Sequence, residues 1–199
     1  IRAGIDPEIV VVRNLTTDLL AQSAQALEKA IREAQMVVLP GGFSGGDEPE
    51  GSAKFICSFL RNPALSDAIM DLLKNRDGLM LGICNGFQAL VKLGLLPFGE
   101  IRDMDDTCPT LTYNQIGRHQ SRYVTTRVAS VQSPWVLRCD VGDLYTIPVS
   151  HGEGRFVAPE AVIANLIAQG QVGTQYVDLE GRPTMDILAN PNGSMEAIE

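Results

Sequence analysis

The chain has few residues of the kinds that bind zinc or form disulfides. Its 199 residues include two histidines and four cysteines, and no two cysteines form a CxxC pair. This composition gives no support to a zinc site or to the disulfide framework of a small secreted domain. We therefore predict no metal and a reducing, cytoplasmic location.

Long apolar runs and an excess of positive charge are also lacking. No apolar run approaches the roughly 20 residues that a membrane span needs, and no basic-then-apolar signal opens the chain. Its 16 Lys and Arg face 24 Asp and Glu, a formal net charge of -8 at pH 7. Nucleic-acid binders gather basic residues on one face, so we expect a small-molecule ligand, with no nucleic acid and no membrane partner.

The length suits one domain with a sizeable core. Hydrophobic residues make up 45% of the chain, and no linker, repeat or low-complexity tract divides it. The chain starts at Ile1 rather than at methionine and stops at Glu199, soon after a turn-like Asn-Pro-Asn-Gly. We therefore expect residues 1–199 to be a single domain, truncated at both ends, of a longer polypeptide.

Strand and helix patterns alternate through the first half. The runs Ile9–Val12 and Met36–Leu39 predict buried parallel strands, and a third strand leads to Cys84. Between them, apolar residues at helical spacing predict a helix from Thr16 or Thr17 onward and two more helices separated by the breaker Asn62-Pro63. The order predicts an α/β fold with right-handed crossovers.

The second half has more β character. Alternation around Tyr123–Val128 and the segments Leu144–Val149 and Val172–Val177 predict further strands. We therefore expect a mostly parallel sheet with extra β elements in the second half of the chain.

The segment Leu79–Leu96, LMLGICNGFQALVKLGLL, predicts a nucleophile elbow around Cys84. A strand running straight into a helix forces a tight turn, and the small residues beside Cys84 permit it. The thiol would then lie at a helix N-terminus, where the thiolate is favoured. A buried, inert thiol is the ordinary alternative for any cysteine, and it is our interpretation for Cys57, Cys108 and Cys139, which have no such glycine frame.

Two further clusters follow apolar strands. Pro40–Asp47 is glycine-rich but continues with acidic residues where a phosphate loop needs Lys and Ser or Thr. Because strand-end loops can pair backbone N–H groups into an oxyanion hole, we predict the N–H groups of Gly42 and Asn85 for that role. The other cluster, Pro148–Phe156, contains His151, which is either a general base or a structural histidine. We assign no role to His119.

Together, the motifs LPGGFSGGD, LGICNGFQAL and PVSHGEGRF resemble the glutaminase domain of a class I glutamine amidotransferase. More narrowly, with EIRDMDD, IGRHQSR, TQYVDLEG and NPNGS, nearly the whole chain resembles the carboxy-terminal part of long-form phosphoribosylformylglycinamidine synthase. The resemblance implies a flavodoxin-like, three-layer α/β/α sandwich.

The resemblance also implies a reaction. Cys84 would attack the side-chain amide of glutamine, with Gly42 and Asn85 as the oxyanion hole, giving a thioester and ammonia. By similarity, the substrate-binding residues would be Ser44, Gln88, Ser150, His151, Gly152 and Glu153. Ammonia would pass to a synthetase domain of the same polypeptide, which uses ATP and Mg to convert formylglycinamide ribonucleotide to its amidine in purine biosynthesis. No cofactor is expected in this domain.

The sequence departs from the family at one point. The family's catalytic His-x-Glu lies near the end of the domain, and the one such spacing here, His151–Glu153, matches the substrate loop instead. A thiol without its base loses several orders of magnitude in rate, so we expect weak glutaminase activity from these residues alone. Two alternatives stay open: a non-catalytic docking module of amidotransferase type, and a DJ-1-like cysteine-elbow hydrolase.

Overall fold

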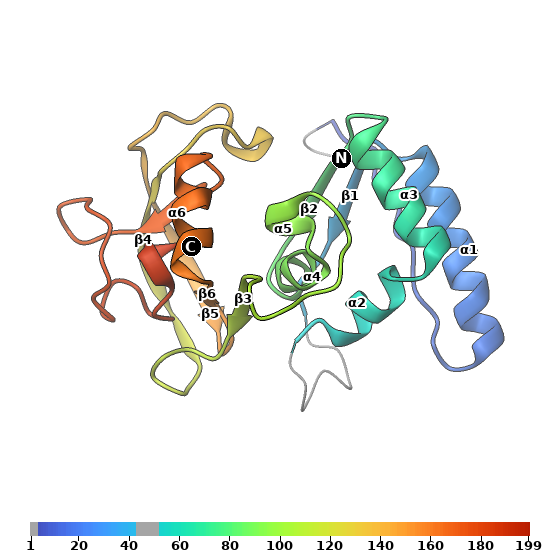
Figure 1. Cartoon of the computed structure of the whole chain (residues 1–199), viewed down its shortest axis with the longest axis horizontal. Helices are drawn as coiled ribbons and strands as arrows, with labels where there is room; N and C mark the ends of the chain where they lie inside the picture. The colour runs from blue at the N-terminus through green and yellow to red at the C-terminus, as the bar shows by residue number, and fades with distance from the viewer. Residues whose placement is uncertain (1–3, 43–51) are drawn as a thin grey trace. The chain divides into compact units, whose positions relative to one another are not determined.

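The computed structural model describes residues 4–42 and 52–199 of the chain. The chain divides into two compact units, the first formed by Ile1–Ala89 with Gly99–Ile101 and the second by Leu90–Phe98 with Arg102–Glu199. That residues 1–199 form a single domain stays a prediction. Mixed helices and strands confirm the predicted α/β class (Figure 1).

The first unit contains a parallel pair of strands joined through helices. Strands β1 (Met36–Leu39) and β2 (Leu79–Gly82) pair in parallel, with Met36 opposite Leu79 and Leu39 opposite Gly82. Both strands were predicted. The connection between them carries α2 (Lys54–Leu60) and α3 (Pro63–Lys74), as the strand-to-strand crossover of a parallel sheet requires.

The helix starts follow local capping chemistry. Helix α1 (Thr17–Glu33) begins after Thr16, whose hydroxyl accepts a hydrogen bond from Leu19 N at 3.2 Å. Helix α3 begins after Asn62 with Pro63 in its first turn, where a missing N–H costs nothing. Figure 1 shows α1 and α3 side by side. Both helices bury apolar side chains, namely Ile31 of α1 and Leu65, Ala68, Ile69 and Leu72 of α3.

The predicted strand at Ile9–Val12 is wrong. This segment has no regular structure, and the Ile9 and Val11 side chains are 87% and 69% exposed. A β-branched run becomes a strand only where another strand satisfies its N–H and C=O groups, and none of the described residues pairs with it. The segment is instead tied to α1, because Arg13 N donates to Ser23 Oγ at 2.9 Å.

Arg76 closes the carboxyl end of α1. Its guanidinium donates to the carbonyl oxygens of Ile31, Arg32 and Ala34 at 2.7, 2.8 and 2.9 Å, and its Nε lies 3.0 Å from Asp71 Oδ2. The last carbonyls of a helix have no donor within it, and a cation there interacts favourably with the helix dipole. This one side chain therefore links α1 to the end of α3.

The second unit is mainly antiparallel, which confirms the predicted β-rich half. Strand β4 (Gln120–Val128) lies between β5 (Leu144–His151) and β7 (Thr174–Tyr176), and β3 (Thr110–Thr112) pairs with β6 (Arg155–Val157). Val124, Tyr176 and Ala197 are buried together, with Ile147 and Val149 packed against them. The helical elements are α5 (Leu95–Phe98), α6 (Glu160–Ala168) and short 3-10 turns at Pro134–Val136 and Met195–Ala197.

Helix α4 (Asn85–Leu93) begins in the first unit and ends in the second.

Over the parts of the chain that the structure describes, no helix is both long and apolar enough to cross a membrane.

Replacing Arg76 with alanine is expected to lower the free energy of unfolding by about 2 kcal/mol, because three helix-end carbonyls lose a charged donor. The matched control is Arg182→Ala, which removes ion pairs from a side chain that is 71% exposed and is expected to cost less than about 1 kcal/mol. Urea denaturation of both variants checks this, and equal losses would contradict the role given to Arg76.

Candidate active site

Cys84 lies between β2 and α4, in the turn that the sequence predicts. Its φ is +54°, in the left-handed region that non-glycine residues rarely adopt, and the residue is exposed. Hydrogen bonds on both sides fix the turn: Ile83 N donates to Leu39 O at 3.0 Å, and Gln88 N donates to Cys84 O at 3.0 Å. A strained backbone that presents an exposed nucleophile at the start of a helix is the geometry of a nucleophile elbow.

The turn depends on close backbone contacts that only glycine permits. A Cβ on Gly86 would overlap the Leu39 carbonyl oxygen and lie 2.6 Å from its carbon, so the first turn of α4 packs directly on the end of β1. A Cβ on Gly41 would lie 2.9 Å from Cys84 Cβ and 3.7 Å from its Sγ. The chain leaving β1 therefore passes beside the thiol.

The other predicted residues of the first unit are placed around this turn. Gly42 follows Gly41 with a φ of +132°, and Asn85 is the first residue of α4 and only 5% exposed. Gln88 lies half-buried one helical turn after Cys84. Ser44 lies outside the described residues. Cys84, Gly42, Asn85 and Gln88 thus belong to one strand-end region.

Ser150, His151, Gly152 and Glu153 lie in the second unit, at the end of β5 and in the turn before β6. Asn114, which sequence reasoning missed, holds this turn. Its backbone N donates to Gly152 O at 2.8 Å, and its Nδ2 donates to His151 O at 2.9 Å. Asn114 is 2% exposed, so these bonds are shielded from water.

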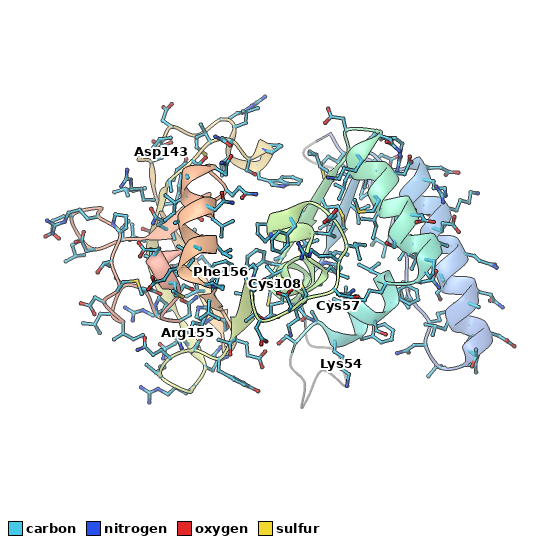
Figure 2. All side chains as sticks on the ribbon, viewed as in Figure 1. Lys54, Cys57, Cys108, Asp143, Arg155 and Phe156 are labelled. Carbon is cyan, nitrogen blue, oxygen red and sulfur yellow. The ribbon has the colours of Figure 1, made fainter. Side chains whose placement is uncertain are left out.

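The turn Asn190–Ser194 supports the same loop from another side. Asn192 Nδ2 donates to Gly154 O at 2.8 Å, and Phe156 N donates to Ser194 Oγ at 3.0 Å. Arg155 Nε donates to Gly193 O at 3.1 Å; Figure 2 shows Arg155 and Phe156 on β6. From the sequence this stretch was predicted only as a turn, but its asparagine and serine side chains are almost fully buried.

The two histidines have different surroundings. His151 Nδ1 lies 2.9 Å from Asn114 Oδ1, and burial together with the nearby His119 lowers the pKa of His151. His119, to which the sequence assigned no role, is exposed, and its Nε2 lies 2.9 Å from Ser150 Oγ. The register of β4 against β5 brings it there, a long-range pairing that no local sequence pattern reports.

The remaining cysteines have no comparable turn. Cys57 Sγ lies 3.8 Å from Ala89 O, Cys108 Sγ lies 3.5 Å from Asp105 Oδ1, and Tyr145 OH lies 3.5 Å from Cys139 Sγ. Figure 2 labels Cys57 and Cys108. Within residues 4–42 and 52–199, no group of three or more His, Cys, Asp or Glu is placed to hold a metal. The exposed thiol in the turn at Cys84 supports cysteine nucleophile chemistry.

A hollow of about 570 Å³ in the second unit contains none of the predicted site residues. Its lining combines one lysine with two aspartates and apolar side chains, among them Lys92, Asp105, Asp106, Cys108 and Pro159.

The chain is similar over most of its length to a family of known proteins. The family model of the CobB/CobQ-like glutamine amidotransferase domain matches residues 1–199. The phosphoribosylformylglycinamidine synthase subunit PurQ of Salinibacter ruber is 35% identical over 184 residues, covering 91% of this chain and 70% of that protein. The subunit of the same name from Gloeobacter violaceus is 32% identical over 203 residues, covering 98% of this chain and 76% of that protein.

A solved structure has a similar fold. The structure of PurLQS from Thermotoga maritima matches with a TM-score of 0.59 and 26% sequence identity, over 83% of this chain. The match spans 61% of that solved chain. The relatives above are named as PurQ subunits, so the narrower resemblance to the long-form enzyme stays a prediction.

Gly86→Ala is expected to destabilise the protein by about 3 kcal/mol, because the added methyl group meets backbone atoms of Leu39 that cannot move independently. Gly173→Ala is the matched control, since a Cβ there meets nothing within 4 Å; it is expected to stay within about 0.5 kcal/mol of the parent. Thermal and urea unfolding measure both. A Gly86→Ala variant as stable as Gly173→Ala would contradict the packing described for the elbow.

The lowered pKa of His151 predicts a pH dependence of stability. The unfolded state binds a proton near the ordinary pKa of 6.5, and the folded state binds it only at lower pH, so the free energy of unfolding falls as the pH drops below about 6.5. Urea denaturation between about pH 7.5 and 5.5 is expected to show a smaller fall in His151→Gln than in the parent. His119→Gln should keep most of the fall; an unchanged fall in His151→Gln would refute the assignment.

Proposed function

Because the chain belongs to the CobB/CobQ-like glutamine amidotransferase domain family, we propose that it is the glutamine-hydrolysing part of a phosphoribosylformylglycinamidine synthase. The observation that carries the chemistry is the left-handed, exposed Cys84 at the start of α4. The names of the relatives support the place of this activity in purine biosynthesis.

In the proposed reaction, the Cys84 thiolate attacks the carbonyl carbon of the glutamine side-chain amide. The electron pair of the C=O bond moves to oxygen, and the N–H groups of Gly42 and Asn85 stabilise this oxyanion. Collapse of the intermediate breaks the C–N bond; the nitrogen takes up a proton and leaves as ammonia. Water then hydrolyses the γ-glutamyl thioester to glutamate and regenerates the thiol.

The substrate-binding roles rest on the motif resemblance. Gln88 lies one turn beyond the nucleophile on α4, and Ser44 belongs to the LPGGFSGGD motif of the sequence. The loop of Ser150–Glu153 is proposed to bind the α-amino and α-carboxylate groups of glutamine. The described hydrogen bonds from Asn114 and Asn192 support this, because a binding loop needs a fixed backbone.

The ammonia is proposed to pass to a synthetase partner that uses ATP and Mg, and this chain itself is proposed to need no cofactor. The similar Thermotoga maritima structure is named PurLQS, and this name supports an assembly of several components. We further propose, from the motifs alone, that the synthetase belongs to the same polypeptide. Its ammonia route must exclude water, since protonated ammonia is no nucleophile. The four cysteines, with no CxxC pair among them, suit the reducing cytoplasm that we propose as the location.

We also infer that residues 1–199 alone hydrolyse glutamine slowly. The one His-x-Glu spacing in this sequence is His151–Glu153. The ring of His151 is half-buried and bonded to Asn114, which suits a structural or binding role better than proton transfer at an exposed thiol. A base contributed from elsewhere would raise the rate by several orders of magnitude.

A glutamine-mimicking electrophile tests the proposed nucleophile. In the protein assembled with its synthetase, the electrophile is expected to modify Cys84, and excess glutamine should block the modification. Cys84→Ser should lose both the labelling and glutamine-dependent synthesis, with a loss of rate of at least about 1,000-fold, while ammonia-dependent synthesis persists. Cys57→Ser is the control and should keep both.

Two outcomes would overturn the proposal. Labelling of Cys84 that glutamine does not affect would favour a DJ-1-like hydrolase. An unreactive Cys84, in an assembly that still makes product from ammonia, would favour a docking module without catalysis.

A further inference from the structure

The orientation of the Asn114 side chain is fixed by its donors. Its Nδ2 donates to two carbonyl oxygens, Arg118 O and His151 O, each at 2.9 Å. Both amide hydrogens are thereby used, so the opposite end of the amide, Oδ1, is an acceptor. Gly154 N also points to this oxygen, at 3.5 Å.

The acceptor at Asn114 determines which nitrogen of His151 carries hydrogen. Oδ1 of Asn114 lies 2.9 Å from His151 Nδ1, and two acceptors do not hydrogen-bond to each other. Nδ1 therefore carries the hydrogen. Burial lowers the pKa of this ring, which favours its neutral form. In a neutral ring with Nδ1–H, the other nitrogen, Nε2, presents a bare lone pair.

That lone pair is buried and has no hydrogen-bond partner among the described residues. Gly154 lies against the ring, since a Cβ there would be 2.9 Å from His151 Cγ and 3.1 Å from its Nδ1. A buried acceptor without a donor costs free energy. A donor from outside the described residues would remove this cost.

We propose that Asn114 is a positioning residue, which holds His151 in the Nδ1–H form so that Nε2 accepts a hydrogen bond from an N–H group of the bound ligand. On the proposed function, on which this part rests, the ligand is glutamine and the donor is its α-ammonium group. Asparagine suits this task better than aspartate would. An aspartate at position 114 could not donate to the two carbonyl oxygens, and its negative charge would favour the charged form of the His151 ring, in which Nε2 is a donor.

Nitrogen-15 NMR of the histidine rings tests the tautomer without any assay of activity. The full-length protein with its partner is labelled at histidine, and the signals absent from His151→Gln identify His151. We expect a protonated Nδ1 and an unprotonated Nε2 at neutral pH. A ring that carries its hydrogen on Nε2, or that is charged, would overturn the proposal.

Glutamine is then added to the Cys84→Ala protein, in which it is not consumed, and calorimetry measures its binding. We expect the Nε2 signal to move as glutamine saturates the protein. Binding without any change at Nε2 would overturn the ligand part of this inference while leaving the proposed function intact. No binding of glutamine would overturn the proposed function, and with it the ligand part, whereas the tautomer result would stand.

Asn114→Asp links the tautomer to function. It is expected to place hydrogen on Nε2 of His151. Because one hydrogen bond to glutamine is then lost, the KM for glutamine should rise about tenfold or more, with a smaller change in kcat. Asn165→Asp introduces the same charge on an exposed face of α6 and should change neither KM nor the His151 signals. A raised KM with an unchanged His151 tautomer would show a merely structural role and overturn the positioning one.

Discussion

The contact between the first turn of α4 and the end of β1 is the constraint on which the candidate active site depends. Gly86 packs on the Leu39 carbonyl, so α4 must begin immediately after β2, and Cys84 completes the turn in a left-handed conformation. A left-handed non-glycine residue costs on the order of 1–3 kcal/mol. The cost persists because the parallel pairing of β1 with β2 and the hydrogen bond from Ile83 to Leu39 fix both sides of the turn.

The loop at the end of β5 is held in another way, by buried amide side chains rather than by glycine contacts. Asn114, Asn190 and Asn192 are at most 2% exposed, and each uses both its donor and its acceptor end. An asparagine can bond to an N–H and a C=O at once, which lets it satisfy an irregular backbone that no strand pairs. A rigid loop and a strained elbow are both forms of preorganisation, and both place polar groups before a ligand arrives.

Local patterns in the sequence predicted what local physics determines. The helix start at Thr16 or Thr17, the break at Asn62-Pro63, the short strands β1 and β2, the helix after Cys84 and the β-rich second half follow from capping, periodicity and turn chemistry. The error at Ile9–Val12 arose because a strand needs a partner edge, which is not a local property. Asn114 and His119 were missed for the same reason, since they reach the loop through long-range contacts. The catalytic and binding roles stay predictions.

The most direct test of the central claim is to trap the intermediate on Cys84. The protein with its synthetase is mixed with glutamine labelled in its carbon chain, quenched in acid during turnover and digested, and the peptide that contains Cys84 is analysed by mass spectrometry. The account predicts a labelled glutamyl group on Cys84, lost on treatment with hydroxylamine as a thioester would be. Turnover of glutamine with this peptide unmodified, or with the label on another residue, would contradict it.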